Sequence, residues 1–368
     1  MFPSHDLGPN KFSFDGRDHW IKTPTELGGV VLANNWTQDL LSNTVALADM
    51  VQDDYFEDQK NHMPQYPTEE SVDDLLVRTS KWGLVNRFGG SVHNVPDNYK
   101  SRLDHELGVI QELGYSDYFL MVEDYTTWAR SQGIQTGPGR GSVAGSLVAW
   151  SLGLTAQVCD PIKQGLYFER FLNKSRVSPP DVDSDFQASR RDEVKAYVRD
   201  KYGPDHTASI GTFGVFHAKS AVRDMAKVYG KDQAFINRIA KLVPANYRGI
   251  PPTVEECEAH SPQLVSDPEL AEIWRKAKRI IGLRRNASSH AAGVIITTGE
   301  PLSSYVPLYR RANSDFMITE FDMKELEDMG FFKFDFLGIS NLDVIDKALA
   351  FIKDRHNVEV NLDNIRRS

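Results

Sequence analysis

Three aspartates, Asp181, Asp183 and Asp185, stand at alternate positions in the segment PDVDSDF at residues 180–186. In an extended strand, alternate side chains point to one face, about 7 Å apart. Their ionised carboxylates repel one another, and Asp is a poor strand former, so neither packing nor propensity explains the pattern. Because hard divalent cations take oxygen ligands, the pattern predicts a Mg²⁺ site.

Two other interpretations of these aspartates are a solvated acidic turn and a calcium loop. A calcium loop of this type requires Gly at its sixth position and Glu at its twelfth. The chain has Phe186 and Asp192 there, which argues against it. The following SxxD segment at Ser189 predicts a capped amphipathic helix ending at Gly203. A strand, a short turn and a helix would therefore hold the acids rigidly.

A glycine-rich loop, GPGRGS at residues 137–142, precedes a helix predicted to start near Val143. Glycines let the backbone approach a ligand closely, and a helix N-terminus attracts anions. Arg140 adds a charge and Ser142 a hydroxyl, but the Walker A pattern does not fit. Downstream, Arg170 in FERF is either a phosphate ligand or an ordinary ion-pair partner. Beside a metal site, we interpret the loop as a triphosphate holder.

A late carboxylate lies in FFKFDFLG at residues 331–338. The segment predicts a strand with Lys333 and Asp335 on one face and three phenylalanines on the other. A buried Asp is costly without a partner, so a salt bridge with Lys333 is one interpretation. The other is a third carboxylate of the metal site. The preceding polar loop, residues 284–293, contains His290, which taken alone is more often structural.

The composition bounds the class of protein. The chain has 368 residues, with 40% hydrophobic and 25% charged residues, as expected of a soluble globular protein with two or three domains. No apolar run approaches the roughly 20 residues of a membrane span, and the start lacks the features of a signal peptide. Cys159 and Cys257 show no metal or redox spacing, so we interpret both as packing residues in a reducing cytoplasm.

The charge is unevenly distributed along a chain whose net charge is −9. Residues 1–70 carry 4 Lys/Arg against 12 Asp/Glu, whereas residues 211–290 carry 13 against 8. Within the basic stretch one predicted helix face presents Lys219, Arg223 and Lys227 at four-residue spacing. Such a face suits contacts with a phosphate backbone, although a solvated surface is the alternative.

The order of the predicted elements suggests a split domain. Helices predicted between residues 215 and 282 separate the aspartate strand from later strands predicted at 293–298, 316–321 and 331–336. This order favours one α/β sheet that carries an inserted helical subdomain.

Together these motifs resemble one family, the alpha subunit of bacterial DNA polymerase III, the family C replicative DNA polymerases. The resemblance covers roughly residues 95–345, in the family's order. Its motifs are GPGRGSVAGSLVAW at 137–150, FERFLN at 168–173, PDVDSDF at 180–186, RRDEV at 190–194, TFGVFHAKSAVRD at 212–224, RNASSHAAGVII at 286–296 and KFDFLG at 333–338.

The resemblance implies an α/β (α+β) fold, with a polymerase-beta-like nucleotidyltransferase palm split by a helical thumb. The expected parts are the tail of a metal-binding PHP domain with its junction at 1–60, palm at 61–212 and 286–340, thumb at 213–285 and the start of the fingers at 341–368. The family's histidine-rich N-terminal motif is absent, and 33 residues follow Asp335. We therefore expect a truncated gene product or one piece of a split polymerase, of cellular or phage origin.

The resemblance also implies the residues of the site. The catalytic, metal-binding aspartates fall on Asp181, Asp183 and Asp335, with Asp185 supporting them. The expected triphosphate contacts are Arg140, Gly141, Ser142, Arg170 and the active-site lysine, Lys333. In the thumb, Lys219, Arg223 and Lys227 would contact the duplex.

The hypothesis is nucleotidyl transfer from dNTPs to a primer 3′ end on two Mg²⁺ ions about 3.5–4 Å apart. The implied partners are primer–template DNA, the remaining polymerase domains and other replisome subunits, including a sliding clamp, but no membrane. Two alternatives are a non-catalytic piece of a split polymerase and a template-independent terminal transferase.

Overall fold

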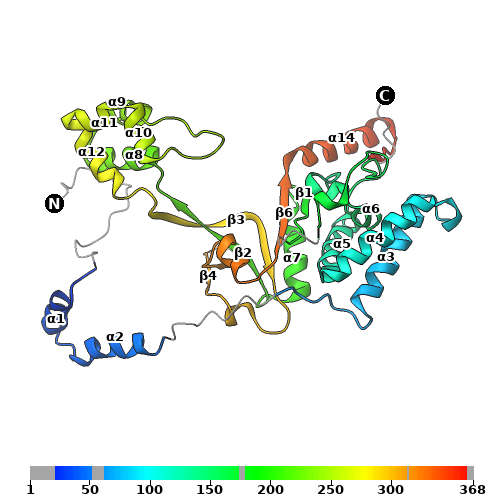
Figure 1. Ribbon diagram of the computed structural model, residues 1–368, viewed down its shortest axis with the longest axis horizontal. Helices are drawn as coiled ribbons and strands as arrows, with labels where there is room; N and C mark the ends of the chain where they lie inside the picture. The colour runs from blue at the N-terminus through cyan, green and yellow to red at the C-terminus, as the bar shows by residue number, and fades with distance from the viewer. Residues whose placement is uncertain (1–20, 52–61, 174–178, 313–314, 363–368) are drawn as a thin grey trace. The chain divides into compact units, whose positions relative to one another are not determined.

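The computed structural model describes residues 21–51, 62–173, 179–312 and 315–362. The chain divides into two compact units (Figure 1). One unit comprises Met1–Asp58 and Gly214–Asn286, and the other comprises Gln59–Phe213 and Ala287–Ser368. The expected junction at 1–60 lies partly outside the described residues, as do the last six residues of the expected finger segment at 341–368.

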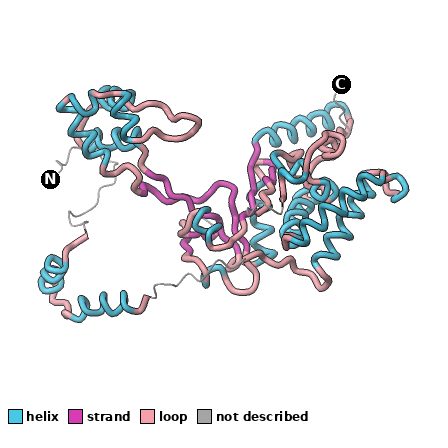
Figure 2. The backbone as a smooth tube through the Cα atoms, in the orientation of Figure 1, coloured by secondary structure: helices cyan, strands magenta, loops and turns pink. Residues whose placement is uncertain are grey.

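The centre of the second unit is a six-stranded sheet of order β1-β6-β3-β2-β5-β4. The fold is therefore mixed α/β, as the sequence predicted. The tube drawing shows its strands in magenta (Figure 2). The strands are β1 (Asp183–Gln187), β2 (Thr207–Val215), β3 (Arg284–Ile296), β4 (Leu308–Arg310), β5 (Met317–Thr319) and β6 (Lys333–Ile339).

Pairing within the sheet sets which residues meet. β1 and β6 are parallel, and their register places Asp183 beside Asp335. β6 and β3 are antiparallel, with Gly293 opposite Asp335. Because side chains alternate along a strand, the aspartates share one face while Phe334 and Phe336 are buried on the other. The alternation predicted for residues 331–336 is confirmed.

Helices cover the phenylalanine face of the sheet. The buried core formed there contains Tyr118, Tyr125, Trp150, Phe334 and Phe336. In Figure 1 several of these helices gather beside β1 and β6. The helices of this unit are α3 (Val72–Arg87), α4 (Asp97–Glu112), α5 (Ser116–Ser131), α6 (Leu147–Ser151), α7 (Arg191–Tyr202), α13 (Met323–Asp328) and α14 (Ser340–His356).

A second, smaller core forms around β2 and β3, where Ile210 and Ile295 pack with Leu302, Leu326 and Phe331. Gly211 lies in β2 with its N–H donating to Thr319 Oγ1 at 2.9 Å. The strand therefore passes very close to β5.

Replacing Gly211 with Ala is expected to destabilise this core. A β-carbon there would lie 2.1 Å from the main-chain oxygen of Thr319, so the β2–β5 pairing must shift. Overpacking of this kind typically costs about 1–3 kcal/mol. Urea unfolding should show the loss. Gly108→Ala is the control, because Gly108 lies exposed in α4 with nothing within 4 Å, and Ala there should be neutral or stabilising. Equal midpoints for the two variants would contradict the prediction.

The first unit contains a helical cluster packed around Trp274, Ile239 and Val222. Its helices are α8 (Ala218–Val228), α9 (Gln233–Lys241), α10 (Val254–His260), α11 (Gln263–Ser266) and α12 (Pro268–Lys278). Two further helices, α1 (Pro24–Ala33) and α2 (Asp39–Asp49), precede residue 52. Among the described helices of both units, none combines the length and apolarity that crossing a bilayer requires.

Two helix starts differ from the sequence prediction. The helix expected to be capped by Ser189 begins at Arg191, and Ser189 Oγ instead donates to Asp343 of α14 at 2.5 Å. The helix expected near Val143 begins at Leu147, capped by Ser146, after a 3₁₀ turn over Gly141–Gly145. Ser189 does not cap α7 because its hydroxyl bonds to Asp343, a residue far along the chain. The 3₁₀ turn separates the glycine loop from the start of α6.

Candidate active site

Three carboxylates converge on one face of the sheet. Asp181 precedes β1, Asp183 opens it, and Asp335 lies in β6. One ligand oxygen from each lies within 4.8 Å of the others. The parallel register of β1 and β6 produces this cluster, since it brings residues about 150 positions apart side by side. The predicted meeting of the late carboxylate with the first cluster is therefore seen in the geometry.

Lys333 lies against this carboxylate cluster. Its Nζ is 2.9 Å from Asp335 Oδ2 and 3.9 Å from Asp181 Oδ1. Burial lowers the pKa of Lys333, but the hydrogen bond to Asp335 and the two carboxylate charges outweigh it, so the net pKa is raised. The salt bridge between Lys333 and Asp335 is therefore confirmed, and Asp335 also meets the first carboxylates, while its role as a metal ligand stays a prediction.

The cluster fits a divalent cation. Asp335 is 5% exposed, and its Oδ1 is buried without a hydrogen-bond partner among the described residues. Burial raises the pKa of Asp181, with the charges of Asp335 and Asp183 adding to the effect against Lys333 and Arg140. Crowded carboxylates with an unsatisfied buried oxygen are the donor set that Mg²⁺ prefers. Lys333 alone leaves that oxygen without a partner.

Asp185 belongs to an ion pair outside the cluster. Its carboxylate accepts from Arg140 Nε at 3.1 Å, while Arg140 Nη1 lies 3.1 Å from Asp183 Oδ2. Burial raises the pKa of Asp185, and Arg140 opposes that shift. The expected supporting position of Asp185 agrees with this geometry, since Arg140 joins it to a member of the cluster.

The glycine loop lies against β1 because Gly137 has no side chain. The N–H of Gly137 donates to the Asp185 carbonyl at 2.9 Å, and a β-carbon on Gly137 would lie 2.6 Å from Asp185 Cβ. At Gly141, which has φ +70°, a β-carbon would lie 3.9 Å from Asp183 Oδ2. Gly141 and Ser142 are exposed at the edge of the carboxylate cluster. The glycine loop and the aspartate segment thus lie side by side.

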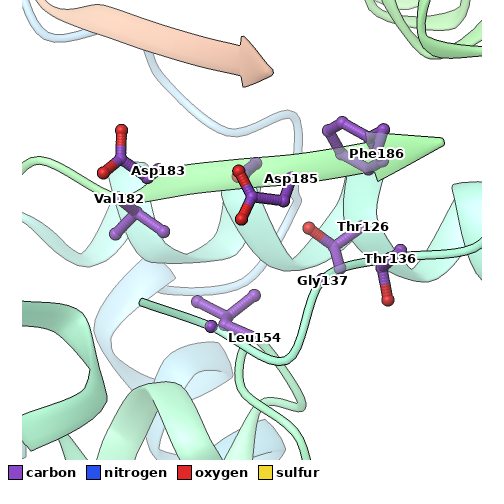
Figure 3. A pocket seen from close by; sticks show the side chains of 10 residues that line it. Thr126, Thr136, Gly137, Leu154, Val182, Asp183, Asp185 and Phe186 are labelled. Carbon is purple, nitrogen blue, oxygen red and sulfur yellow. The ribbon is translucent and has the colours of Figure 1, made fainter. Parts of the chain in front are cut away.

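The space beneath β1 is too small for a nucleotide. Figure 3 shows Asp183 and Asp185 on the strand, with Thr136 and Gly137 on the neighbouring loop. The pocket that they line with Val182 and other residues has a volume of about 10 Å³. Room of that size holds at most one water molecule. This pocket is therefore not a nucleotide-binding site.

A buried ion pair, which the sequence analysis missed, holds the residues that directly follow the glycine loop. Glu106 of α4 accepts from Arg102 Nε at 2.6 Å, from Ser146 Oγ at 3.0 Å and from the Val148 N–H at 3.0 Å. Arg102 Nη2 also donates to the Gly145 carbonyl at 3.1 Å. Their i, i+4 spacing on a helix was the only sequence signal.

The same arginine reaches the segment that carries Arg170. Arg102 Nη2 lies 3.5 Å from the Leu166 carbonyl. A β-carbon on Gly145 would lie 2.7 Å from the Tyr167 carbonyl, so the 3₁₀ turn after the glycine loop touches this segment. Arg170 is exposed at the end of the 3₁₀ turn Phe168–Arg170. Arg102 of α4 therefore links the residues that follow the glycine loop to those that precede Arg170.

The pH dependence of stability should report the burial of Glu106. Burial raises the pKa of Glu106 above its ordinary 4.5. The folded protein then binds this proton more strongly than the unfolded chain, so stability falls as pH rises from about 4.5 through the raised value. Glu106→Gln has no such proton. The wild-type free energy of unfolding, minus that of Glu106→Gln, is expected to decline over this window.

Urea unfolding at several pH values measures this difference. Glu112→Gln, at an exposed position of the same helix, is the matched control for loss of a carboxylate. A difference that stays constant or grows with pH would exclude the raised pKa.

Two tyrosines of α5 hold β1 from the buried face, and the sequence analysis did not single them out. The Val182 N–H donates to Tyr118 Oη at 3.0 Å, and the hydroxyls of Tyr125 and Ser184 lie 3.0 Å apart. Ser184, the residue between the second and third aspartates, thus has a polar partner. The seven-residue spacing of the tyrosines, two helical turns, was the available signal.

The predicted duplex contacts lie in the first unit. Lys219, Arg223 and Lys227 are exposed on α8. Lys227 Nζ is 3.5 Å from Asp224 Oδ1, and Asp224 also pairs with Arg285 at 2.8 Å. The face is basic but carries one internal acid. These residues and the carboxylate cluster belong to different units, and contact of the basic face with DNA stays a prediction.

Known proteins contain similar sequences. A family profile described as Bacterial DNA polymerase III alpha NTPase domain matches residues 74–338. The chain belongs to this family. DNA polymerase III subunit alpha of Bacillus subtilis (strain 168) is 43% identical over 314 residues, which cover 83% of this chain and 27% of the relative. The corresponding protein of Aquifex aeolicus (strain VF5) is 36% identical over 387 residues, covering 97% and 33%.

The chain thus spans about a quarter to a third of the length of these DNA polymerase III alpha relatives. The matched region of the family contains the carboxylate cluster, the glycine loop and Lys333.

Proposed function

We propose that this chain carries the nucleotidyl-transfer centre of a replicative DNA polymerase. In this proposal the sheet is a polymerase-beta-like palm, at residues 61–212 and 286–340, and the helices of 213–285 form a thumb. The observation that supports it most directly is the convergence of Asp181, Asp183 and Asp335 within 4.8 Å. Membership of the DNA polymerase III alpha family supports the choice of nucleotidyl transfer as the reaction.

The proposed substrates are a primer–template duplex and a dNTP. The primer 3′-hydroxyl attacks the α-phosphorus, the bond to the β-phosphate oxygen breaks, and pyrophosphate leaves while the hydroxyl proton passes to solvent. Two Mg²⁺ ions bound by the three aspartates would supply Lewis-acid stabilisation of the phosphoryl oxygens and lower the pKa of the attacking hydroxyl.

The chain's own residues bind and orient the triphosphate. Gly141 and Ser142 lie exposed beside Asp183 and offer main-chain and hydroxyl groups. Arg140 uses Nε and Nη1 on Asp185 and Asp183. Because a guanidinium has five N–H donors, Arg140 retains donors for phosphate oxygens. Arg170 is proposed as a further phosphate contact, and Lys333 offsets the charge of the cluster.

The remaining parts of this proposal concern partners. Lys219, Arg223 and Lys227 on the exposed face of α8 suit contacts with duplex phosphates. The remaining polymerase domains and other replisome subunits, including a sliding clamp, complete the assembly in the cytoplasm.

Primer extension with labelled primer–template DNA, dNTPs and Mg²⁺ tests the proposal. The chain is assayed alone and with the remaining regions of a family member supplied as a separate polypeptide. Template-directed extension in either case supports it. Addition without a template indicates a terminal transferase, and duplex binding with no extension in any combination indicates a non-catalytic piece. Either of these last two results would remove the proposal.

A further inference from the structure

His290 in β3 makes an unusual local contact. Its Nδ1 accepts the N–H of Gly293 at 2.6 Å and that of Ala292 at 3.3 Å. Since Nδ1 is the acceptor, the proton of the neutral ring lies on Nε2. The backbone thereby fixes the tautomer, and the half-buried ring offers one N–H donor from its far side.

This ring lies on the face of the sheet that carries the carboxylates. Gly293 stands directly opposite Asp335 in the β3–β6 pairing, and opposite residues of an antiparallel pair point to the same face. A β-carbon on Gly293 would lie 2.9 Å from His290 Nδ1 and 2.8 Å from Ile210 Cδ1. The imidazole therefore takes up the space of the missing side chain, one strand away from Asp335.

Two arginines hold the segment around His290 through its carbonyl groups. Arg191 Nη1 donates to the Ala291 carbonyl at 3.0 Å, and Arg311 Nη2 donates to the Ala287 carbonyl at 2.6 Å. Arg191 also pairs with Asp192 at 2.6 Å. Residues 287, 289 and 291 are exposed. The segment thus combines a fixed N–H donor, exposed backbone and two guanidinium groups.

This chemistry suits a phosphodiester more than a metal or an acidic side chain. Nδ1 is occupied by backbone donors, so the ring has no lone pair facing outward for a cation. N–H donors beside guanidinium groups attract phosphate oxygens. A nucleic-acid strand whose end reaches Asp335 would pass this segment.

We propose that His290 Nε2–H donates to a non-bridging oxygen of the last phosphodiester of the primer strand and so positions the primer 3′ end beside Asp335. This inference rests on the proposed function and adds a strand-binding residue to it. The alternative is that the ring only holds the backbone turn through Nδ1. In that case loss of the Nε2 donor would not change how the protein uses a primer.

Two substitutions separate these roles. In His290→Asn, the side-chain oxygen is able to accept the same nearby N–H groups, as in an Asx turn, but the shorter amide no longer places an N–H donor at the position of Nε2. His290→Ala loses both. We expect His290→Asn to keep the wild-type unfolding midpoint while kcat/KM for primer–template falls about tenfold to hundredfold, with KM for dNTP unchanged. An unchanged kcat/KM for primer–template in a folded His290→Asn variant would overturn the inference.

A modified primer identifies the contact itself. A methylphosphonate at the last linkage replaces one non-bridging oxygen with a methyl group and removes the negative charge of the proposed acceptor. We expect it to weaken wild-type binding of primer–template, measured by fluorescence anisotropy, about tenfold, and binding by His290→Asn much less. A methylphosphonate three linkages upstream is the control, and should affect both proteins equally. Independent effects of the last-linkage modification and the substitution would overturn the inference.

The binding measurement also separates the two proposals. If the methylphosphonate weakens binding by the wild type more than by His290→Asn but no templated extension occurs, the strand contact is supported and the polymerase function is excluded. If templated extension occurs but the modification affects both proteins equally, the polymerase function is supported and the strand contact is excluded.

Discussion

Replacing Asp183 with Asn is expected to lower templated primer extension by about 10³-fold. Asp183 is one of three carboxylates within 4.8 Å of one another, and the amide removes the charge that balances a divalent cation. Loss of several kcal/mol of transition-state stabilisation corresponds to such a factor. Steady-state extension at saturating dNTP, in the combination that supports wild-type activity, measures the effect.

Asp185→Asn provides the matched control for Asp183→Asn. Asp185 lies two residues away on the same strand and face, but its carboxylate pairs with Arg140 and lies outside the cluster. We expect a loss of about tenfold, as for residues that orient the ligands of a metal. Equal losses at the two positions would show that the cluster has no special role, and wild-type activity of Asp183→Asn would refute its assignment.

Replacing Lys333 with Met is expected to lower the free energy of unfolding by about 3 kcal/mol in EDTA. The Lys333 and Asp335 side chains are 22% and 7% exposed, and removing one partner of a buried pair leaves an uncompensated charge. Asp335 Oδ1 already lacks a partner among the described residues. Added Mg²⁺ should recover part of the loss, because a bound cation replaces the missing charge.

Urea unfolding with and without Mg²⁺ measures both effects. Lys353→Met is the control, since Lys353 pairs with Glu359 where both side chains are exposed at 65% and 79%. It should change little in either buffer. If Lys333→Met matched Lys353→Met, or if Mg²⁺ had no differential effect on Lys333→Met, the ion pair would not stabilise the cluster as described.

Much of the site could be predicted from local sequence. The alternation of Asp181, Asp183 and Asp185, and of Lys333 with its flanking phenylalanines, follows from the two-residue period of a strand. Such patterns depend only on neighbouring residues, and the structure shows the same alternation. Helix starts were less predictable. Ser146 and Ser189 are both residues that can cap a helix, but only Ser146 does so, because Ser189 bonds to Asp343 instead.

Other features had no readable local signal. The buried pair of Arg102 and Glu106 resembles any i, i+4 surface pair until Ser146 and Val148, which follow the glycine loop, pack on it. His290 looked structural alone, and only the β3–β6 register places its ring near Asp335. Long-range pairing decides contacts of this kind, and residue types do not encode it locally.

The sequence by itself determined the family, the mixed α/β class and the residue types of the site, since long ordered motifs and strand periodicity are carried by the chain alone. The tertiary structure decided which carboxylates converge. It joined Asp335 to Asp181 and Asp183 through parallel pairing, and it turned Asp185 to Arg140. The physical reason is that charge compensation depends on distances of a few ångströms, which the packing of β1, β6 and the glycine loop sets.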